Sequence, residues 1–188
     1  MNKVAPVLFL ALGLLALPAA AATEPGGTVL AGFSFRAPDG WQALSTDDAA
    51  LTRLADWSLP GGAEVVVFRF GNGQPGDVSA NLNQWAGSVT TPQGTPAVAK
   101  VSQRRIGSYP FNQIEAFGTY LLPESGAPGL PPSALPGSGL VGAVLELPTG
   151  PLYVRLTGTE AAVRHALPEL ARFLESVRPP PSSPAPKS

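Results

Sequence analysis

An α+β fold, in which two helices cover an antiparallel, twisted sheet, is what this sequence predicts. Between residues 29 and 177, short apolar runs alternate with Gly, Pro, Asn and Asp, a pattern typical of many strands joined by turns. Two longer segments instead carry apolar residues at helical spacing. The chain has no Cys, which excludes disulfides, thiolate catalysis and Cys-ligated metals.

Eight strands are expected from the apolar runs and the turn residues that bound them. The turn at 60–62 joins two of them as a hairpin, and the turn at 148–151 joins the last two. The run 65–70 is apolar on both faces, which indicates a central, covered strand. The expected strands are 30–37, 41–44, 54–59, 65–70, 97–103, 113–122, 140–147 and 152–157.

Two helices are predicted by stripes of apolar residues. The first runs from Asp77, a good N-cap, to about residue 88, with Trp85 at the centre of its stripe. The second runs from 159 to about 177, and because its stripe keeps its phase past Pro168, that proline is expected to kink the helix. These helices are the expected covers of the sheet.

The domain organisation follows from composition. Residues 1–22 have the charged, apolar and small-residue parts of a secretory signal peptide, so we expect export to the periplasm or medium and no stable membrane insertion after cleavage. Residues 23–178 are expected to form a single domain. Within it, 123–139 is a Pro/Gly-rich loop, mobile or acting as a lid. Residues 179–188 form a disordered Pro-rich tail.

The charge balance excludes two classes of partner. The formal net charge is −1 and only 13% of residues are charged, so no basic surface for nucleic acid and no polybasic patch for a membrane surface is expected. The remaining candidates are an envelope protein or a small ligand.

The glycines of GNGQPG, at 71–76, match the spacing of a nucleotide-binding loop. However, Pro75 removes one backbone donor, Asp77 places a carboxylate where a phosphate would sit, and no acidic residue follows at the distance that a ribose requires. We therefore interpret the loop as a strand-to-helix connection and expect no cofactor.

The sequence also lacks residues that other kinds of catalytic site and metal site require. His165 is the only histidine and lies about 200° around its helix from the apolar stripe, which places it in solvent. With one His and no Cys, only a carboxylate metal site is possible, and Asp47 and Asp48 are better explained as a polar turn or helix start. No catalytic residue and no metal site is predicted.

Four charged residues in or beside predicted strands form the one candidate polar cleft: Arg69, Glu115, Glu146 and Arg155. If they come together, they form either a cross-strand ion-pair ladder or a ligand cleft. Glu115 and Glu146 are also the only plausible carboxylate pair for hydrolysis. Asn81 lies about 60° from the stripe of its helix and is a candidate for a partner surface or, as a half-buried amide, for a tie to a neighbouring segment.

Three runs carry a resemblance to a known family: ANLNQWAG at 80–87, FGTYL at 117–121 and LVGAVLELPTGPLYVRLTG at 140–158. They resemble an uncharacterised family of exported bacterial proteins. The order of elements is similar to the PsbP-like α/β/α sandwich of photosystem accessory subunits. This resemblance covers most of the chain after residue 22, rests on glycines and aromatics, and implies a fold without implying a catalytic residue.

The sequence therefore favours an exported, non-catalytic binding or accessory domain of the bacterial cell envelope. The alternative is a small hydrolase that uses Glu115 and Glu146, with the loop at 123–139 as its lid.

Overall fold

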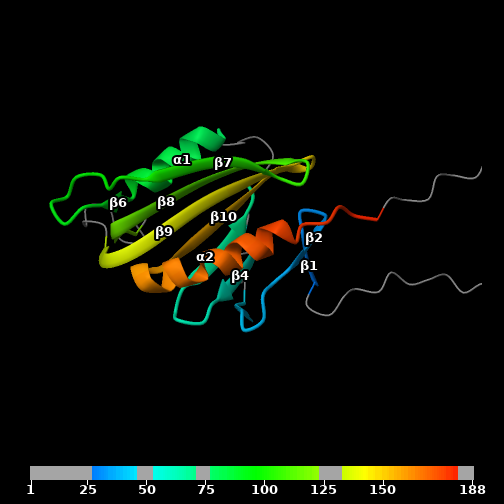
Figure 1. Ribbon diagram of the computed structural model, residues 1–188, viewed down its shortest axis with the longest axis horizontal. Coiled ribbons are helices and arrows are strands. Elements are labelled where there is room, and N and C mark those ends of the chain that lie inside the picture. The colour runs from blue at the N-terminus through cyan, green and yellow to red at the C-terminus, as the bar shows by residue number, and fades with distance from the viewer. Residues whose placement is uncertain (1–26, 46–52, 71–76, 123–132, 182–188) are drawn as a thin grey trace, which may run out of the picture.

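Ten strands and two helices make up the part of the chain that the computed structural model describes, residues 27–45, 53–70, 77–122 and 133–181 (Figure 1). The helices are α1 (Val78–Gly87) and α2 (Glu160–Glu175). The strands are β1 (Gly27–Leu30), β2 (Phe33–Arg36), β3 (Gln42–Ala43), β4 (Arg53–Ser58), β5 (Glu64–Phe68), β6 (Val89–Thr90), β7 (Lys100–Ile106), β8 (Tyr109–Leu121), β9 (Ala134–Leu147) and β10 (Gly150–Thr159).

One antiparallel sheet contains eight of these strands. Their order is β3-β4-β5-β10-β9-β8-β6, and β7 pairs with β8 outside this path, while β1 and β2 form a separate hairpin. Every pairing of strands in the described residues is antiparallel, including the two hairpins that the sequence predicts, β4–β5 and β9–β10. The predicted α+β fold with an antiparallel sheet and two helices is confirmed.

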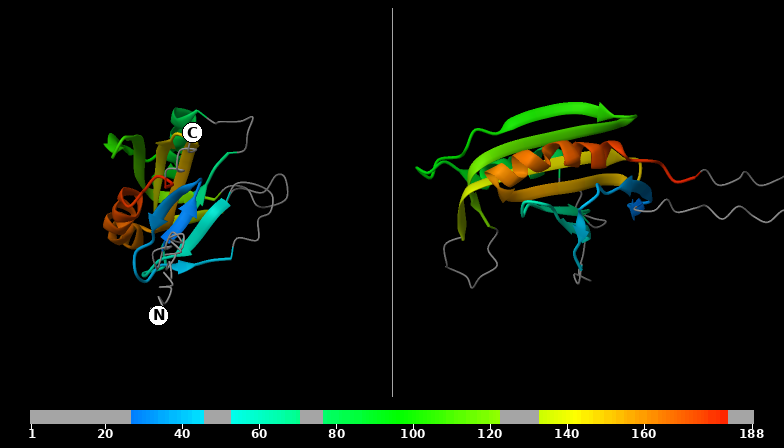
Figure 2. Two further views of the ribbon diagram at one scale, coloured as in Figure 1. Left: turned by 90° about the vertical axis from the view of Figure 1, so that its right-hand side faces the viewer. Right: turned by 60° about the horizontal axis from the view of Figure 1, so that its bottom comes forward.

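The two helices cover opposite faces of the sheet. On one, the α1 face, Leu82 and Trp85 of α1 pack against apolar side chains of β8, β9 and β10. On the other, the α2 face, Val163, Leu170 and Phe173 of α2 pack against β9 and β10 and against the β1–β2 hairpin. The right-hand view of Figure 2 shows α2 lying across the front of the sheet. Successive residues of β9 and β10 alternate between these two clusters, as the two-residue repeat of a strand requires.

Both helices begin where the sequence predicts. The Asp77 side chain accepts a hydrogen bond from the backbone N–H of Ser79 at 2.8 Å, which caps α1. Thr159 caps α2 by accepting from the N–H of Ala162. Pro168 lies inside α2, which continues through it as one helix. Trp85 is buried and His165 is exposed, as predicted.

Two differences in extent between the predicted and observed elements have a clear local cause. The strand expected at 30–37 is the β1–β2 hairpin, because Ala31 and Gly32 adopt positive φ and turn the chain. The loop expected at 123–139 is shorter, since β9 already begins at Ala134. Pro136 and Gly137 are residues typical of loops, so the sequence did not indicate that a strand begins before them. The pairing with β8 is irregular at this point: Gly118 pairs with Ser138 and Tyr120 with Leu135, which leaves Pro136 and Gly137 between the two pairs.

Several predictions fall outside the described residues. These are the signal peptide at 1–22, the pair Asp47 and Asp48, the loop at 71–76, most of the 123–139 loop and the tail beyond 181. Within the described ranges, neither helix has the length and apolar character needed to cross a membrane.

Candidate functional site

The two carboxylates predicted to share a cleft lie on opposite faces of the sheet. Glu115 of β8 is directly opposite Val141 of β9, which belongs to the core of the α2 face. Glu146 is five residues further along β9, an odd number, so its side chain points to the α1 face with Val144. The sheet therefore does not bring Glu115 and Glu146 together, and the hydrolase alternative loses its pair of carboxylates.

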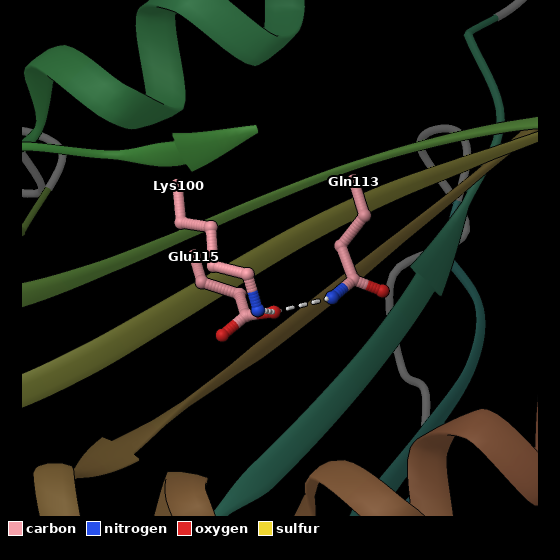
Figure 3. A network of polar contacts seen from close by, with 3 residues as sticks. All are labelled: Lys100, Gln113 and Glu115. Atoms are coloured by element: carbon pink, nitrogen blue, oxygen red, sulfur yellow. Dashed lines mark hydrogen bonds and ion pairs between the residues drawn. The ribbon is translucent and has the colours of Figure 1, made fainter. Parts of the chain in front are cut away.

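Glu115 instead belongs to a small polar network on the α2 face (Figure 3). One of its oxygens accepts from Lys100 Nζ at 3.3 Å and from Gln113 Nε2 at 3.0 Å. Lys100 stands directly across the ladder from Glu115, because β7 and β8 form a hairpin. Glu115 therefore forms a cross-strand ion pair with this lysine of β7, which was not among the four residues considered for a ladder.

The other three members of the candidate cleft lie apart from Glu115, and two of them have local partners of their own. Glu146 accepts a hydrogen bond from Asn112 Nδ2 at 3.0 Å. Arg69 donates to the backbone carbonyl of Thr149, in the turn between β9 and β10. Arg155 is on the α1 face opposite Gly142, four positions from Glu146 along β9. The four residues therefore do not form one site.

Asn81 offers no partner surface, because it is buried and its amide donates to the Asp77 carbonyl at 3.1 Å within its own helix. It stabilises the start of α1, and among the described residues no strand accepts or donates a hydrogen bond at its side chain. This is a correction to both roles that the sequence suggested, and its cause is that an asparagine four residues after the N-cap can reach that carbonyl.

A charged group that sequence reasoning missed is Asp56, in the middle of β4. Its side chain lies on the α1 face and is only 4% exposed, while Ala55 and Trp57 face the core on the other side. Arg53 Nε is 3.2 Å from Asp56 Oδ2, and the second oxygen, Oδ1, is buried without a hydrogen-bond partner. The sequence signal for this residue is an acidic side chain at an apolar-flanked position of a predicted strand.

Burial raises the pKa of the Asp56 carboxyl above its usual range, because the charged form loses its hydration. The charges that face it are Arg53 and Arg155, which lower this pKa, and Glu64, which raises it. Arg155 stands two strands away, across Val66, and its own Nε is also buried without a partner. Asp56 is therefore a source of instability in its ionised form.

We expect Asp56→Asn to raise the free energy of unfolding by about 1 kcal/mol at pH 7, because it removes a poorly hydrated buried charge. A folded-state pKa above the unfolded one means that the folded state binds the proton more tightly. The protonated Asp56 carboxyl therefore makes its full contribution to the free energy of unfolding below the unfolded-state pKa. This contribution is lost as the pH rises through the raised folded-state pKa.

Urea denaturation of both chains between pH 3.5 and pH 7 measures this effect. The advantage of the variant should grow with pH from about zero at the acid end. An advantage that shrinks as the pH rises would mean that the attraction of Arg53 outweighs the cost of burial.

Two open hollows, of about 420 and 480 Å³, lie beside the C-terminal end of α2. They share Arg36 and Ser176, and acidic and basic side chains both line the second. The carbonyl end of a helix disfavours an anion, and Arg178 donates to two of the carbonyls there. These hollows point to no particular ligand.

The strand β7 is exposed along most of its length. We call its outer side the β7 edge and define it by Lys100, Val101, Gln103, Arg104 and Arg105. Val101 is 63% exposed, and Val98 just before the strand is 96% exposed. Among the described residues, β8 is the only strand that pairs with β7. Figure 2, on the right, shows β7 as the outermost strand of the sheet.

Three cations and no acidic side chain lie along this edge. Arg104 pairs with Glu175 of α2 at 3.0 Å and stands over the ring of Phe111. Lys100 pairs with the mostly buried Glu115, yet its own side chain stays 73% exposed. Arg105 donates to the backbone carbonyl of Ser108, which carries no charge. The β7 edge therefore combines unpaired backbone with excess positive charge.

Comparison with known proteins adds two structures. No family model matches the chain, and no curated protein matches it. The solution structure of cyanobacterial PsbP (CyanoP) from Synechocystis sp. PCC 6803 is similar over 79% of this chain and 86% of that one, with a TM-score of 0.47 and 10% identity. The crystal structure of PA94, a protein of unknown function from Pseudomonas aeruginosa, is similar over 76% of this chain and 99% of that one, with a TM-score of 0.45 and 15% identity. These likenesses concern the course of the chain and say nothing of function.

Proposed function

We propose that this chain is an exported, non-catalytic binding domain of the bacterial cell envelope, which docks on another protein through the β7 edge. The observation that carries the proposal is that β7 pairs on one side only while its side chains stay exposed. A sheet edge of this kind is a template for a second chain. The separation of Glu115 and Glu146 onto opposite faces supports the non-catalytic part of the proposal.

Export is supported by the charged, apolar and small-residue segments of residues 1–22. It is tested by N-terminal sequencing of the full chain recovered from the periplasm and medium of a bacterial host. A mature protein that starts near Thr23 is expected. Recovery of the uncleaved chain in the cytoplasmic fraction alone would contradict export.

Partner binding is tested by chemical crosslinking in the envelope fraction of the bacterium that encodes the chain, using a C-terminal tag. The variant Arg105→Glu reverses one exposed charge of the β7 edge. Arg172→Glu is the matched control, because Arg172 is exposed on α2 and pairs with Glu169 of the same helix. Each captured protein is then purified and titrated calorimetrically against the three chains.

A true partner should bind the parent chain and Arg172→Glu equally, and bind Arg105→Glu about tenfold more weakly, because the reversed charge adds repulsion at the edge. The proposal fails if no purified candidate binds the parent chain, or if both charge reversals weaken binding to the same extent.

A further inference from the structure

The β7–β8 hairpin fixes which backbone groups of β7 face outward. Gly107 and Ser108 form a two-residue turn, and Gly107 has a φ of +57°, as the first residue of a type II′ turn requires. In such a hairpin, the pair that flanks the turn, Ile106 and Tyr109, is a hydrogen-bonded pair. Pairs alternate from there, so Lys100, Ser102 and Arg104 also bond to β8.

The remaining residues of β7 therefore direct their N–H and C=O groups away from the sheet. They are Val101, Gln103 and Arg105, and all three are exposed. The position of Pro110 agrees with this register: it stands opposite Arg105, in a pair without hydrogen bonds, where a residue with no N–H costs nothing. These three alternate residues give up to six outward backbone groups for a further strand.

We infer that the partner binds by adding an extended strand to β7, with an acidic side chain beside Arg105 and an apolar one beside Val101. This inference rests on the proposed function and names the mode of binding at the same edge. It is supported by the backbone N–H and C=O groups of Val101, Gln103 and Arg105, which point away from the sheet. Main-chain hydrogen bonds provide affinity in this mode, and alternate side chains provide specificity.

The chemistry of the partner follows from the side chains on the α1 face of β7. Val101 and Arg105 share this face and are four residues apart, so the partner strand needs an apolar and an acidic residue at the same separation. A second copy of this chain does not fit. Two β7 strands paired antiparallel about Gln103 would set Arg105 opposite Val101 of the other copy, where no acid meets it. They would also place Arg104 diagonally across the new ladder from Lys100 and Arg104 of the other copy, so that like charges become neighbours.

Proline substitution separates the outward positions from the inward ones. Gln103→Pro removes an N–H that faces outward, so β7 keeps its bonds to β8 and the melting temperature should change little. Ser102→Pro is the matched control, because it removes an N–H that bonds to β8 and should lower the melting temperature clearly. This contrast establishes the register before any partner is added.

Strand addition itself is tested with a synthetic peptide and the purified, folded chain, observed by NMR. The peptide has nine residues of Thr and Val, blocked at both ends, with a Glu and a Val four residues apart. It should shift the amide signals of Val101, Gln103 and Arg105 and protect those amides from exchange. The variant Gln103→Pro should bind this peptide about tenfold more weakly than the parent chain does. The parent chain should likewise bind a peptide that has Lys in place of Glu about tenfold more weakly.

Equal binding of the peptide by Gln103→Pro, no binding by the parent chain, or self-association of the parent chain in ultracentrifugation would overturn the inference. The proposed function is judged separately, by the purified partner. A partner that binds Gln103→Pro as well as the parent chain would leave the function standing and remove strand addition as its mode. A peptide that binds as expected, with no partner captured, would leave the edge as a strand acceptor and remove the proposed function.

Discussion

Phe173→Ala should lower the free energy of unfolding by about 3–5 kcal/mol, the usual cost of truncating a fully buried aromatic side chain. Phe173 of α2 is completely buried, and its ring centroid lies 5.3 Å from those of Phe35, Trp41 and Trp57. These rings join the β1–β2 hairpin and β4 to α2. The truncation leaves a cavity where three segments meet, which urea denaturation monitored by tryptophan fluorescence will detect.

Phe173→Leu is the control, since leucine keeps much of the buried volume and should cost clearly less than alanine. Because the β1–β2 hairpin lies outside the large sheet, the alanine variant should also expose β2 to faster hydrogen exchange. A loss of less than about 1 kcal/mol in Phe173→Ala would contradict this account of the cluster.

Gly142→Ala should cost about 3 kcal/mol or more, at the upper end of the range for overpacking a core. Gly142 lies in the middle of β9 under α1. A Cβ atom there would overlap the Cε3 atom of Trp85 and lie only 2.7 Å from its Cζ3. A strand glycine at this point allows the helix to approach the sheet closely. The cost is measured by urea denaturation of the purified variant.

A double-mutant cycle isolates the cause. Trp85→Leu alone should be destabilising, but it creates the space that the new methyl group needs, so the double variant should be more stable than the sum of the single changes predicts, by about 0.5–3 kcal/mol. Gly87→Ala is the matched control: nothing lies within 4 Å of its new Cβ at the end of α1. It should be neutral or stabilise by up to about 1 kcal/mol. Additive costs in the cycle would exclude the proposed overlap.

Patterns that are local in the chain could be predicted from the sequence. The stripe through Trp85 and the cap at Asp77 define α1, because helical periodicity and capping involve neighbours within one or two turns. The β4–β5 and β9–β10 hairpins follow from short turns between apolar runs. These elements differ from their predicted bounds by only a few residues.

The candidate site could not be predicted because it depends on register between strands. The two-residue alternation along each strand places Glu115 on the same face as Gln113, and Glu146 on the same face as Val144. Whether those two faces coincide is decided by the pairing of Glu115 with Val141, which no local pattern encodes. The same pairing problem hid Lys100 as the partner of Glu115, although the β7–β8 turn is only two residues long.

Proline and glycine misled the prediction at one place. Pro136 and Gly137 are typical of loops, yet they lie near the start of β9. Gly137 has positive φ, and the pairing of β8 with β9 is irregular between Gly118 and Tyr120. Tertiary pairing with β8 therefore extends the strand through residues whose local preferences oppose it.

Hydrogen exchange along β7 in the isolated protein tests the central claim most directly, because the claim is that this strand offers free backbone groups to a partner. The account predicts an alternation: the amides of Val101, Gln103 and Arg105 exchange fast, while those of Ser102 and Arg104 exchange slowly. Uniform protection from 101 to 105 would contradict it by showing that the edge is covered, and the opposite alternation would contradict it by showing that these amides already bond to β8.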